Sequence, residues 1–367
     1  MAKQQYWDIR PILSKKAIYN MIIGERSNGK TYGVLQYGLE EHFDNGSELA
    51  IVRRYDEDFK GKRGQQMFDS LVNNGVIKKL SHGKWNGVKY YSQRWYFTKY
   101  EDGKLVETSD TPFAYGFSLS SMEHDKSTSY PRIRIILFDE FLTREYYLIN
   151  EFVLFQNVIS TIVRERDDVR IFMCGNTVNK YSPYFKEMGL KNVKNQREGT
   201  IDLYTYGDTG LSVAVEYCDS PVKQKKSNKY FAFDNPKLKM ITHGKWEIDI
   251  YPHLPIKYLD SNVKYQYFIK FDDEILHCKI IEVKNEDGIN TLFTYVHRKT
   301  TPIHDDNRWL VYQQEYSPLP NYKRRLTKPT SKLEKKLAMF FIKEKVFYQD
   351  NDVGEVMRNY LEWSSAS

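Results

Sequence analysis

Gly24-Glu25-Arg26-Ser27-Asn28-Gly29-Lys30-Thr31 matches the pattern GxxxxGK[ST] without a gap. In such a loop the glycines let backbone N–H groups curl around phosphate oxygens, the lysine reaches the β- and γ-phosphates, and the final hydroxyl ligates Mg²⁺. An apolar strand is predicted before the loop, at residues 17–23, and a helix after it, at residues 30–43. This is the context that a P-loop requires, so all eight residues are predicted to bind nucleotide. The alternative is an ordinary glycine-rich turn.

A second apolar strand, at residues 133–138, runs into two carboxylates, Asp139 and Glu140. Asp139 is predicted to hold the magnesium ion, and Glu140 to polarise the water that attacks the γ-phosphate. A Glu beside the Asp favours an ATP-hydrolysing motor over a GTPase-type switch or a small-molecule kinase. Without the P-loop upstream, the same pair would indicate only a turn at a strand end.

A third apolar strand, at residues 169–174, leads into Asn176. An amide beside the Asp–Glu strand can sense the γ-phosphate, although a turn capped by Asn176 explains it equally well. Further candidates for phosphate contacts are Arg26, which also has the option of pairing with Glu140, and Arg53, Arg54, Arg164, Arg166 and Lys126. For each of these residues, the alternative interpretation is a solvated surface side chain. Tyr6 and Trp7 are predicted either to stack on adenine or to pack at the start of the domain.

Strands and helices alternate over about 200 residues, which predicts a parallel α/β sheet. A long helix is expected at residues 146–166, and short hairpins at residues 61–110. Three strands in a meander follow at residues 265–299. Helices are expected at residues 331–347, opened by a capping box of Ser331 and Glu334, and at residues 353–363.

The composition is that of a folded protein with a basic second half. Of 367 residues, 41% are hydrophobic and 15% aromatic, which excludes a disordered chain. The longest apolar run, residues 337–342, is too short for a membrane span, and the N-terminus lacks the apolar core of a signal peptide. Three separated cysteines suggest neither a disulfide framework nor a zinc site, so we expect a soluble protein of a reducing compartment. The net charge is +1 over residues 1–220 and +6 over residues 221–367, which indicates either a polyanionic partner or solubility.

Taken in order, these pieces resemble the DNA-packaging ATPase, or encapsidation protein, of small short-tailed bacteriophages whose motors use a packaging RNA. The resemblance rests on the arginine-containing P-loop, VRRY at residues 52–55, MEHDKSTSYPRI at residues 122–133, ILFDEF at residues 136–141, TIVRER at residues 161–166, and CGN at residues 174–176. It covers about 200 residues closely and the rest only by architecture. The stretch at residues 61–110 is enlarged relative to the family.

The resemblance implies an ASCE (additional-strand) P-loop ATPase that binds ATP and Mg²⁺. It implies a pentameric ring at the portal vertex that pumps double-stranded DNA into a procapsid in the host cytoplasm, with portal protein and packaging RNA as partners. By motif, Lys30 and Thr31 bind nucleotide and magnesium, Asp139 holds the metal, and Glu140 is the catalytic base. Arg164 matches an arginine finger and Lys126 a lysine acting across subunits. The implied domains are an ATPase at residues 1–215, a linker module at residues 216–255, and a vestigial RNase H-like nuclease at residues 256–367.

Two other functions remain open from sequence. The first is a terminase or helicase with an active nuclease. Asp272, Asp273 and Glu274 are predicted in a hairpin turn, whereas such a nuclease needs acidic residues converging on two metals, so we expect no nuclease activity. The second is a nucleotide-dependent assembly switch, which has no need of Glu140. An ABC transporter is disfavoured because its signature motif is missing. Basic clusters at residues 223–226, 323–325 and 332–336 are candidates for nucleic-acid or portal contact, or solvated surface.

Overall fold

The chain forms two compact units, Met1–Trp246 and Glu247–Ser367, in a computed structural model. The structure describes residues 7–124, 129–219, 246, 249–284, 288–304 and 308–366. Most of the predicted linker module at residues 216–255 lies outside the described residues, so the division into three parts stays a prediction.

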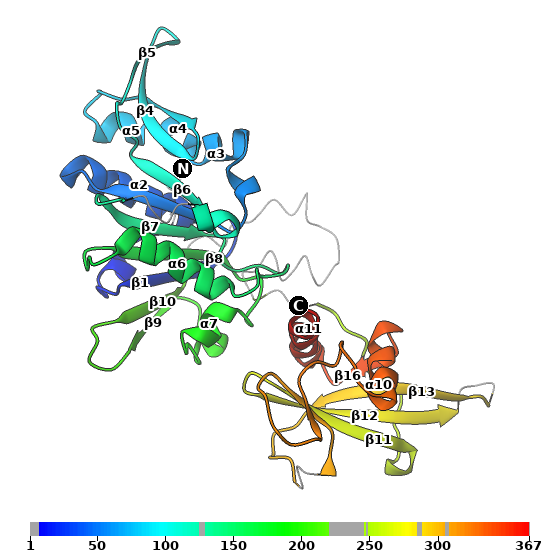
Figure 1. Ribbon diagram of the computed structural model, residues 1–367. Helices are drawn as coiled ribbons and strands as arrows, with labels where there is room; N and C mark the ends of the chain where they lie inside the picture. Colours follow the sequence, from blue (N-terminus) through cyan, green and yellow to red (C-terminus); the bar gives the residue numbers. More distant parts are fainter. Residues whose placement is uncertain are drawn as a thin grey trace. The chain divides into compact units, whose positions relative to one another are not determined.

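A ten-stranded sheet forms the centre of the first unit (Figure 1), in the order β3-β4-β6-β2-β7-β8-β1-β10-β9, with β5 paired to β4. The strands are β1 (Tyr19–Gly24), β2 (Glu48–Arg53), β3 (Gly87–Tyr91), β4 (Arg94–Glu101), β5 (Lys104–Thr108), β6 (Ala114–Ser118), β7 (Ile133–Asp139), β8 (Arg170–Asn176), β9 (Thr200–Thr205) and β10 (Ser212–Tyr217). Six neighbouring strands in this order are mutually parallel: β6, β2, β7, β8, β1 and β10. Since β8 lies between the P-loop strand β1 and the Asp–Glu strand β7, this is the additional-strand arrangement, as predicted.

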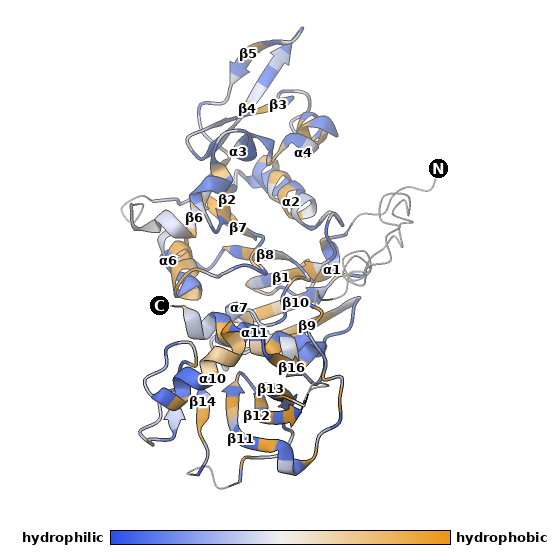
Figure 2. Ribbon diagram, turned by 90° about the vertical axis from the view of Figure 1, so that its right-hand side faces the viewer, coloured by the Kyte–Doolittle hydropathy of each residue, from blue (hydrophilic) through white to orange (hydrophobic). Residues whose placement is uncertain are grey.

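Helices cover both faces of the parallel strands. The helices of the first unit are α1 (Arg10–Leu13), α2 (Lys30–Asn45), α3 (Lys62–Gln66), α4 (Asp69–Asn73), α5 (Val76–Leu80), α6 (Glu151–Val163) and α7 (Pro183–Glu187). In Figure 2, α2 and α6 lie on opposite sides of β7 and β8, and each contributes apolar side chains to a separate core. Gly38 lets α2 approach β2 closely, because a Cβ at Gly38 would lie 2.2 Å from Leu49 Cδ2.

The helix predicted at residues 146–166 is shorter than expected. It begins at Glu151 because Asn150 has a left-handed backbone, with φ of 55°. It ends at Val163, where Arg164 takes φ of 51° and its N–H still bonds the Ser160 carbonyl. The preceding segment is instead a loop, whose Leu148 N–H donates to the Glu151 carboxylate at 2.8 Å. Arg164 and Arg166 therefore lie just beyond the helix.

The stretch at residues 61–110 contains the predicted hairpins, which join the main sheet through β4 and β6, and also the three short helices α3, α4 and α5. Its aromatic side chains extend the hydrophobic core that α2 covers. Phe97 stacks on Phe113 with ring centroids 4.0 Å apart, and the buried Trp95 packs against Phe59 and Phe68. The stretch is therefore an extension of the first unit.

The second unit holds a six-stranded sheet in the order β15-β14-β11-β12-β13-β16. Its elements are β11 (Val263–Phe271), β12 (Glu274–Lys284), β13 (Asn290–Arg298), β14 (Val311–Gln313), β15 (Tyr322–Lys323), β16 (Val346–Tyr348), α10 (Lys332–Ile342) and α11 (Asn351–Ser365). The antiparallel β11, β12 and β13 confirm the predicted meander. β14 adds parallel to β11 and β15 parallel to β14, the arrangement expected of an RNase H-like sheet.

The helix predicted at residues 331–347 ends early, at Ile342, because Glu344 takes φ of 54° and the chain then enters β16. Half of its capping box forms: Ser331 Oγ accepts from the Glu334 N–H, while the Glu334 carboxylate bonds Thr330 instead. Within the described residues, the helices lack the length and apolar character needed to cross a bilayer.

Candidate nucleotide-binding site

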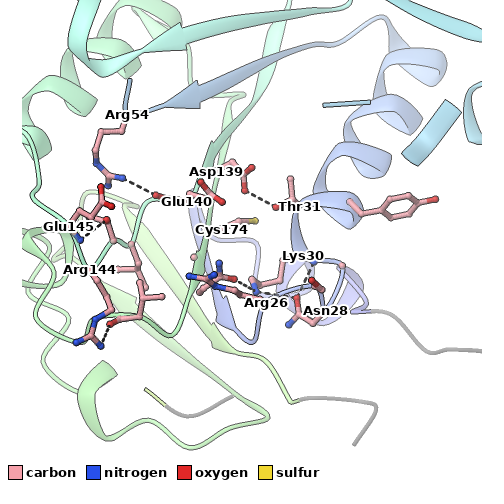
Figure 3. Close-up of a pocket in the computed structure, with 18 residues that line it drawn as sticks. Arg26, Asn28, Lys30, Thr31, Arg54, Asp139, Glu140, Arg144, Glu145 and Cys174 are labelled. Carbon is pink, nitrogen blue, oxygen red and sulfur yellow. Dashed lines mark hydrogen bonds between the residues drawn. The ribbon is translucent and has the colours of Figure 1, made fainter. Parts of the chain in front are cut away.

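A cavity of about 600 Å³ opens where the parallel strands β1, β7 and β8 end (Figure 3). The register of these strands explains why distant motifs meet, since Gly24 lies opposite Asn176 and Asp139 opposite Cys174. The lining residues are Arg26, Ser27, Asn28, Gly29, Lys30, Thr31, Tyr32, Arg54, Asp139, Glu140, Leu142, Thr143, Arg144, Glu145, Cys174, Gly175, Asn176 and Val178. The three predicted motifs therefore share one cavity.

Lys30 is a buried cation surrounded by acceptors of the loop itself. Its Nζ donates to the carbonyls of Glu25 at 2.6 Å and Gly24 at 3.2 Å, and to Asn28 Oδ1 at 3.1 Å. Burial lowers the pKa of Lys30 from its usual value. An anionic phosphate would stabilise the charged amine, and the start of α2 at this point favours an anion as well. The loop therefore has the donors and charge that a nucleotide phosphate needs.

Thr31 and Asp139 lie together on the other side of the loop. Thr31 Oγ1 donates to Asp139 Oδ1 at 2.7 Å, and the Asp139 side chain is 7% exposed. A hydroxyl and a carboxylate are hard oxygen ligands of the kind that Mg²⁺ prefers, and Mg²⁺ commonly completes its shell with water and substrate phosphates. Among the residues that the structure describes, no group of three or more His, Cys, Asp or Glu side chains is placed to hold a metal. The site thus fits a magnesium ion that arrives with nucleotide.

Arg53, the last residue of β2, pairs with both carboxylates. Its Nη2 lies 2.7 Å from Asp139 Oδ2, and its Nη1 lies 2.8 Å from Glu140 Oε2. Burial alone would lower the pKa of Arg53, but the charges of Asp139 and Glu140 outweigh it and raise that pKa. The Glu140 side chain is 65% exposed and so stays accessible to solvent. Arg53, and not the exposed Arg26 considered from the sequence, makes the ion pair with Glu140.

Asn176, at the end of β8, lies within reach of the P-loop lysine. Its Oδ1 accepts from Lys30 Nζ at 3.3 Å. This contact joins the third strand to the group that would hold the γ-phosphate. The arrangement supports the γ-phosphate sensor over the simple turn cap, although the role of Asn176 stays a prediction.

Of the two residues predicted to act across subunits, the structure describes only Arg164, which does not line the cavity. Arg164 is exposed just beyond α6, and it is absent from the described lining residues. Lys126 lies outside the described residues. Arg166 is engaged elsewhere, because its Nη2 donates to the carbonyls of Ile133 and Ile162 at 2.8 and 2.9 Å. Arg166 therefore braces the start of β7.

The aromatic residue before the P-loop packs against the protein. The Trp7 ring covers Gly33, where a Cβ would lie 2.9 Å from two ring carbons. Its Nε1 donates to Glu216 Oε1 at 3.0 Å, and its backbone N–H donates to the Asn28 carbonyl. Burial raises the pKa of Glu216 to about 7. Trp7 thus anchors the N-terminal segment to the loop, while Tyr6 lies outside the described residues.

Sequence reasoning missed how four residues support the site. Arg54, considered as a surface arginine, is buried and pairs with Glu151, the first residue of α6, which also accepts from Tyr184. Arg144 lines the cavity and contacts the Val178 carbonyl at 3.5 Å. The available signal in the sequence was the pair of consecutive arginines, Arg53 and Arg54, at the end of a strand. Their partners could not be identified from it because they lie 86 to 97 residues away.

Comparison with known proteins places the chain in a family. Residues 1–229 match the model of the podovirus DNA encapsidation protein (Gp16). The DNA packaging proteins of Bacillus phages PZA and phi29 are each 28% identical over 205 residues, which is 55% of this chain and 55% of each relative. The DNA packaging protein of Bacillus phage B103 is 28% identical over 189 residues, or 51% of this chain and 52% of the relative. The chain thus spans about half the length of the curated relatives it matches.

Two solved structures share the fold across the chain. "The Phi-28 gp11 DNA packaging Motor" has a TM-score of 0.54 and 17% identity, covering 100% of this chain and 99% of that chain. "The bacteriophage Phi-29 viral genome packaging motor assembly" has a TM-score of 0.55 and 20% identity, covering 96% of both chains. At these identities the likeness shows the fold alone. With the family match over residues 1–229, the conclusion is that the chain belongs to the podovirus DNA encapsidation protein (Gp16) family.

Proposed function

We propose that this protein binds ATP with Mg²⁺ in the P-loop cavity and couples ATP hydrolysis to the translocation of double-stranded DNA into a procapsid. The observation that carries the proposal is the meeting of Lys30, the Thr31–Asp139 pair and Glu140 around one cavity, in a chain of the DNA encapsidation family. Lys30 and the loop N–H groups would hold phosphate, and Thr31 and Asp139 would hold the metal. Bound Mg²⁺ would neutralise charge on the phosphates.

Glu140 is the proposed general base. Its carboxylate is exposed to solvent, whereas the adjacent Asp139 is buried against Thr31. A carboxylate open to solvent can orient a water molecule and accept its proton, while the buried one is committed to the metal site. Asn176, bonded to Lys30 Nζ, would then respond to loss of the γ-phosphate.

The proposed assembly is a homo-oligomeric ring, with five subunits expected from the family, acting at the portal vertex in the host cytoplasm. Double-stranded DNA, the portal protein and a packaging RNA are its proposed partners. The DNA packaging proteins among its relatives and the two packaging-motor structures that share its fold support this proposal. The net positive charge of residues 221–367 supports it as well. The exposed Arg164 would serve as the arginine finger for a neighbouring subunit, with Lys126 acting beside it.

For the second unit we expect no nuclease activity. Asp272 and Asp273 lie between β11 and β12, away from a strand centre, and Glu274 pairs with Arg298 at 2.7 Å. A metal-dependent plasmid-nicking assay tests this expectation. Nicking by the purified protein with Mg²⁺ or Mn²⁺, lost in Asp273→Asn, would instead favour a terminase-like enzyme.

The test of the proposed function is steady-state ATP hydrolysis with and without linear double-stranded DNA. We expect DNA to stimulate the wild type, and Glu140→Gln to lose at least about 100-fold in kcat because the base is gone. Glu101→Gln, an exposed change on β4, is the matched control and is expected to retain wild-type turnover. Full hydrolysis by Glu140→Gln would contradict the assignment of the base, and hydrolysis indifferent to DNA in the assembled motor would favour an assembly switch.

A further inference from the structure

Arg54 donates hydrogen bonds to two consecutive backbone carbonyls in the turn that carries Glu140. Its Nη1 donates to the Glu140 carbonyl at 3.2 Å (Figure 3). Its Nη2 donates to the Phe141 carbonyl at 2.8 Å. The Phe141 N–H in turn donates to the Cys174 carbonyl of β8 at 3.2 Å. The turn after β7 is thus bonded from two directions.

This turn needs such support because of its backbone conformation. Glu140 has φ of 61°, in the left-handed region that a residue with a Cβ disfavours. A residue in this region keeps its conformation only when the surrounding structure holds it there. The direction of the Glu140 side chain follows from that backbone geometry, so the bonds that hold the turn also aim the carboxylate.

Arg54 is itself fixed by a fully buried carboxylate. The Glu151 side chain has no exposed surface. It accepts from Arg54 Nε at 2.8 Å and Nη2 at 2.9 Å, from the Tyr184 hydroxyl at 2.9 Å, and from the Leu148 N–H at 2.8 Å. The Arg54 guanidinium also lies 5.2 Å from the centroid of the Tyr147 ring. Because both oxygens of Glu151 are occupied, its geometry leaves Arg54 little freedom to move.

We propose that Arg54, held by Glu151 and Tyr184, is a positioning residue that sets the orientation of Glu140 for hydrolysis. The inference rests on the proposed function, in which Glu140 is the base. Arg54 lines the cavity but acts here through the carbonyls of Glu140 and Phe141. Its partner Glu151 begins α6, so the network also joins the catalytic turn to the helix that ends next to Arg164. Neighbouring Arg53 bonds the carboxylate of Glu140, whereas Arg54 bonds its backbone.

The experiment is a double-mutant cycle between the network and the base. Arg54→Lys and Glu151→Gln are each made alone and together with Glu140→Gln, and single-turnover hydrolysis is measured beside the affinity for a non-hydrolysable ATP analogue. We expect each single change to lower the rate roughly tenfold or more while the affinity stays within about twofold. In the Glu140→Gln background neither change should lower the rate further, because no base remains to be aimed.

Glu48→Gln is the matched control. Glu48 is also a nearly buried carboxylate paired with an arginine, Arg132, but at the opposite end of β2, so its loss should leave the hydrolysis rate unchanged. An equal loss of rate with and without Glu140, or an affinity of Glu151→Gln for the analogue that falls in step with its rate, would overturn the proposal in favour of a structural role. If Arg54→Lys no longer binds nucleotide, Tyr184→Phe decides: a drop of about twofold or more in rate at unchanged affinity supports the proposal, and an unchanged rate refutes it. Undiminished hydrolysis by Glu140→Gln alone would identify a failure of the proposed function itself.

Discussion

Replacing Arg53 with glutamine should destabilise the first unit strongly, and mainly through Asp139. The Arg53 and Asp139 side chains are 17% and 7% exposed, and their charged atoms lie 2.7 Å apart. Removing one partner of such a buried pair costs about 3–5 kcal/mol, because the other charge is left buried and uncompensated. The pair with Glu140 should contribute no more than about 1 kcal/mol, since that carboxylate is 65% exposed. We therefore expect Arg53→Gln to lower the free energy of unfolding by about 3–5 kcal/mol.

The assay is urea denaturation in two double-mutant cycles, Arg53→Gln with Asp139→Asn and Arg53→Gln with Glu140→Gln. Replacing Trp309 and Trp363 with Phe confines the tryptophan signal to the first unit. The coupling energy should exceed about 1.5 kcal/mol for the Asp139 cycle and stay below about 1 kcal/mol for the Glu140 cycle. A larger coupling with Glu140 than with Asp139 would refute the reasoning, because burial would then not decide the strength of the two pairs.

Three further outcomes are expected. The pKa of Glu216 is about 7 in the folded protein against a usual 4.5. The protonated carboxyl group therefore contributes to the free energy of unfolding below pH 4.5, and this contribution should be lost as the pH rises through 7. That loss is about 3 kcal/mol. Urea denaturation should show most of this difference in unfolding free energy between pH 5 and pH 8 for the wild type, and little of it for Glu216→Gln. Gly38→Ala should lower the melting temperature, at a cost of about 1–3 kcal/mol, because its Cβ would overlap Leu49; an unchanged melting temperature would show that α2 can shift. Asp139→Asn should raise the Mg²⁺ concentration needed for half-maximal hydrolysis roughly tenfold or more, whereas equal Mg²⁺ dependence would exclude Asp139 as a ligand.

The parts of the site that were predictable from sequence are those set by local chain geometry. The P-loop joins one strand to the helix that follows it, and Asp139 ends its own strand, so each motif carries its structural context within a few residues. The parallel sheet then brings these strand ends to one edge. This is why the sequence was sufficient to predict the cavity and the order of its three motifs.

The roles of Arg53 and Arg54 were not predictable in this way. Successive residues at a strand end point to opposite sides, so one arginine reaches the carboxylates of Asp139 and Glu140 and the other reaches Glu151. Which arginine takes which partner depends on contacts with residues far along the chain. The start of α6 was misplaced for a related reason, since residues 146–150 have a helix-compatible composition but adopt a loop that bonds the buried Glu151.

Retention of ATP by the Glu140→Gln variant is the sharpest single test of the proposed nucleotide chemistry. Wild type, Glu140→Gln and Lys30→Ala are mixed with γ-labelled ATP and Mg²⁺, and bound ATP and released phosphate are followed over time. Glu140→Gln should bind ATP as tightly as the wild type and hold it uncleaved at least about 100 times longer, while Lys30→Ala should fail to retain it. Cleavage by Glu140→Gln at the wild-type rate, or tight ATP binding by Lys30→Ala, would contradict the assignment of this cavity as the hydrolytic site.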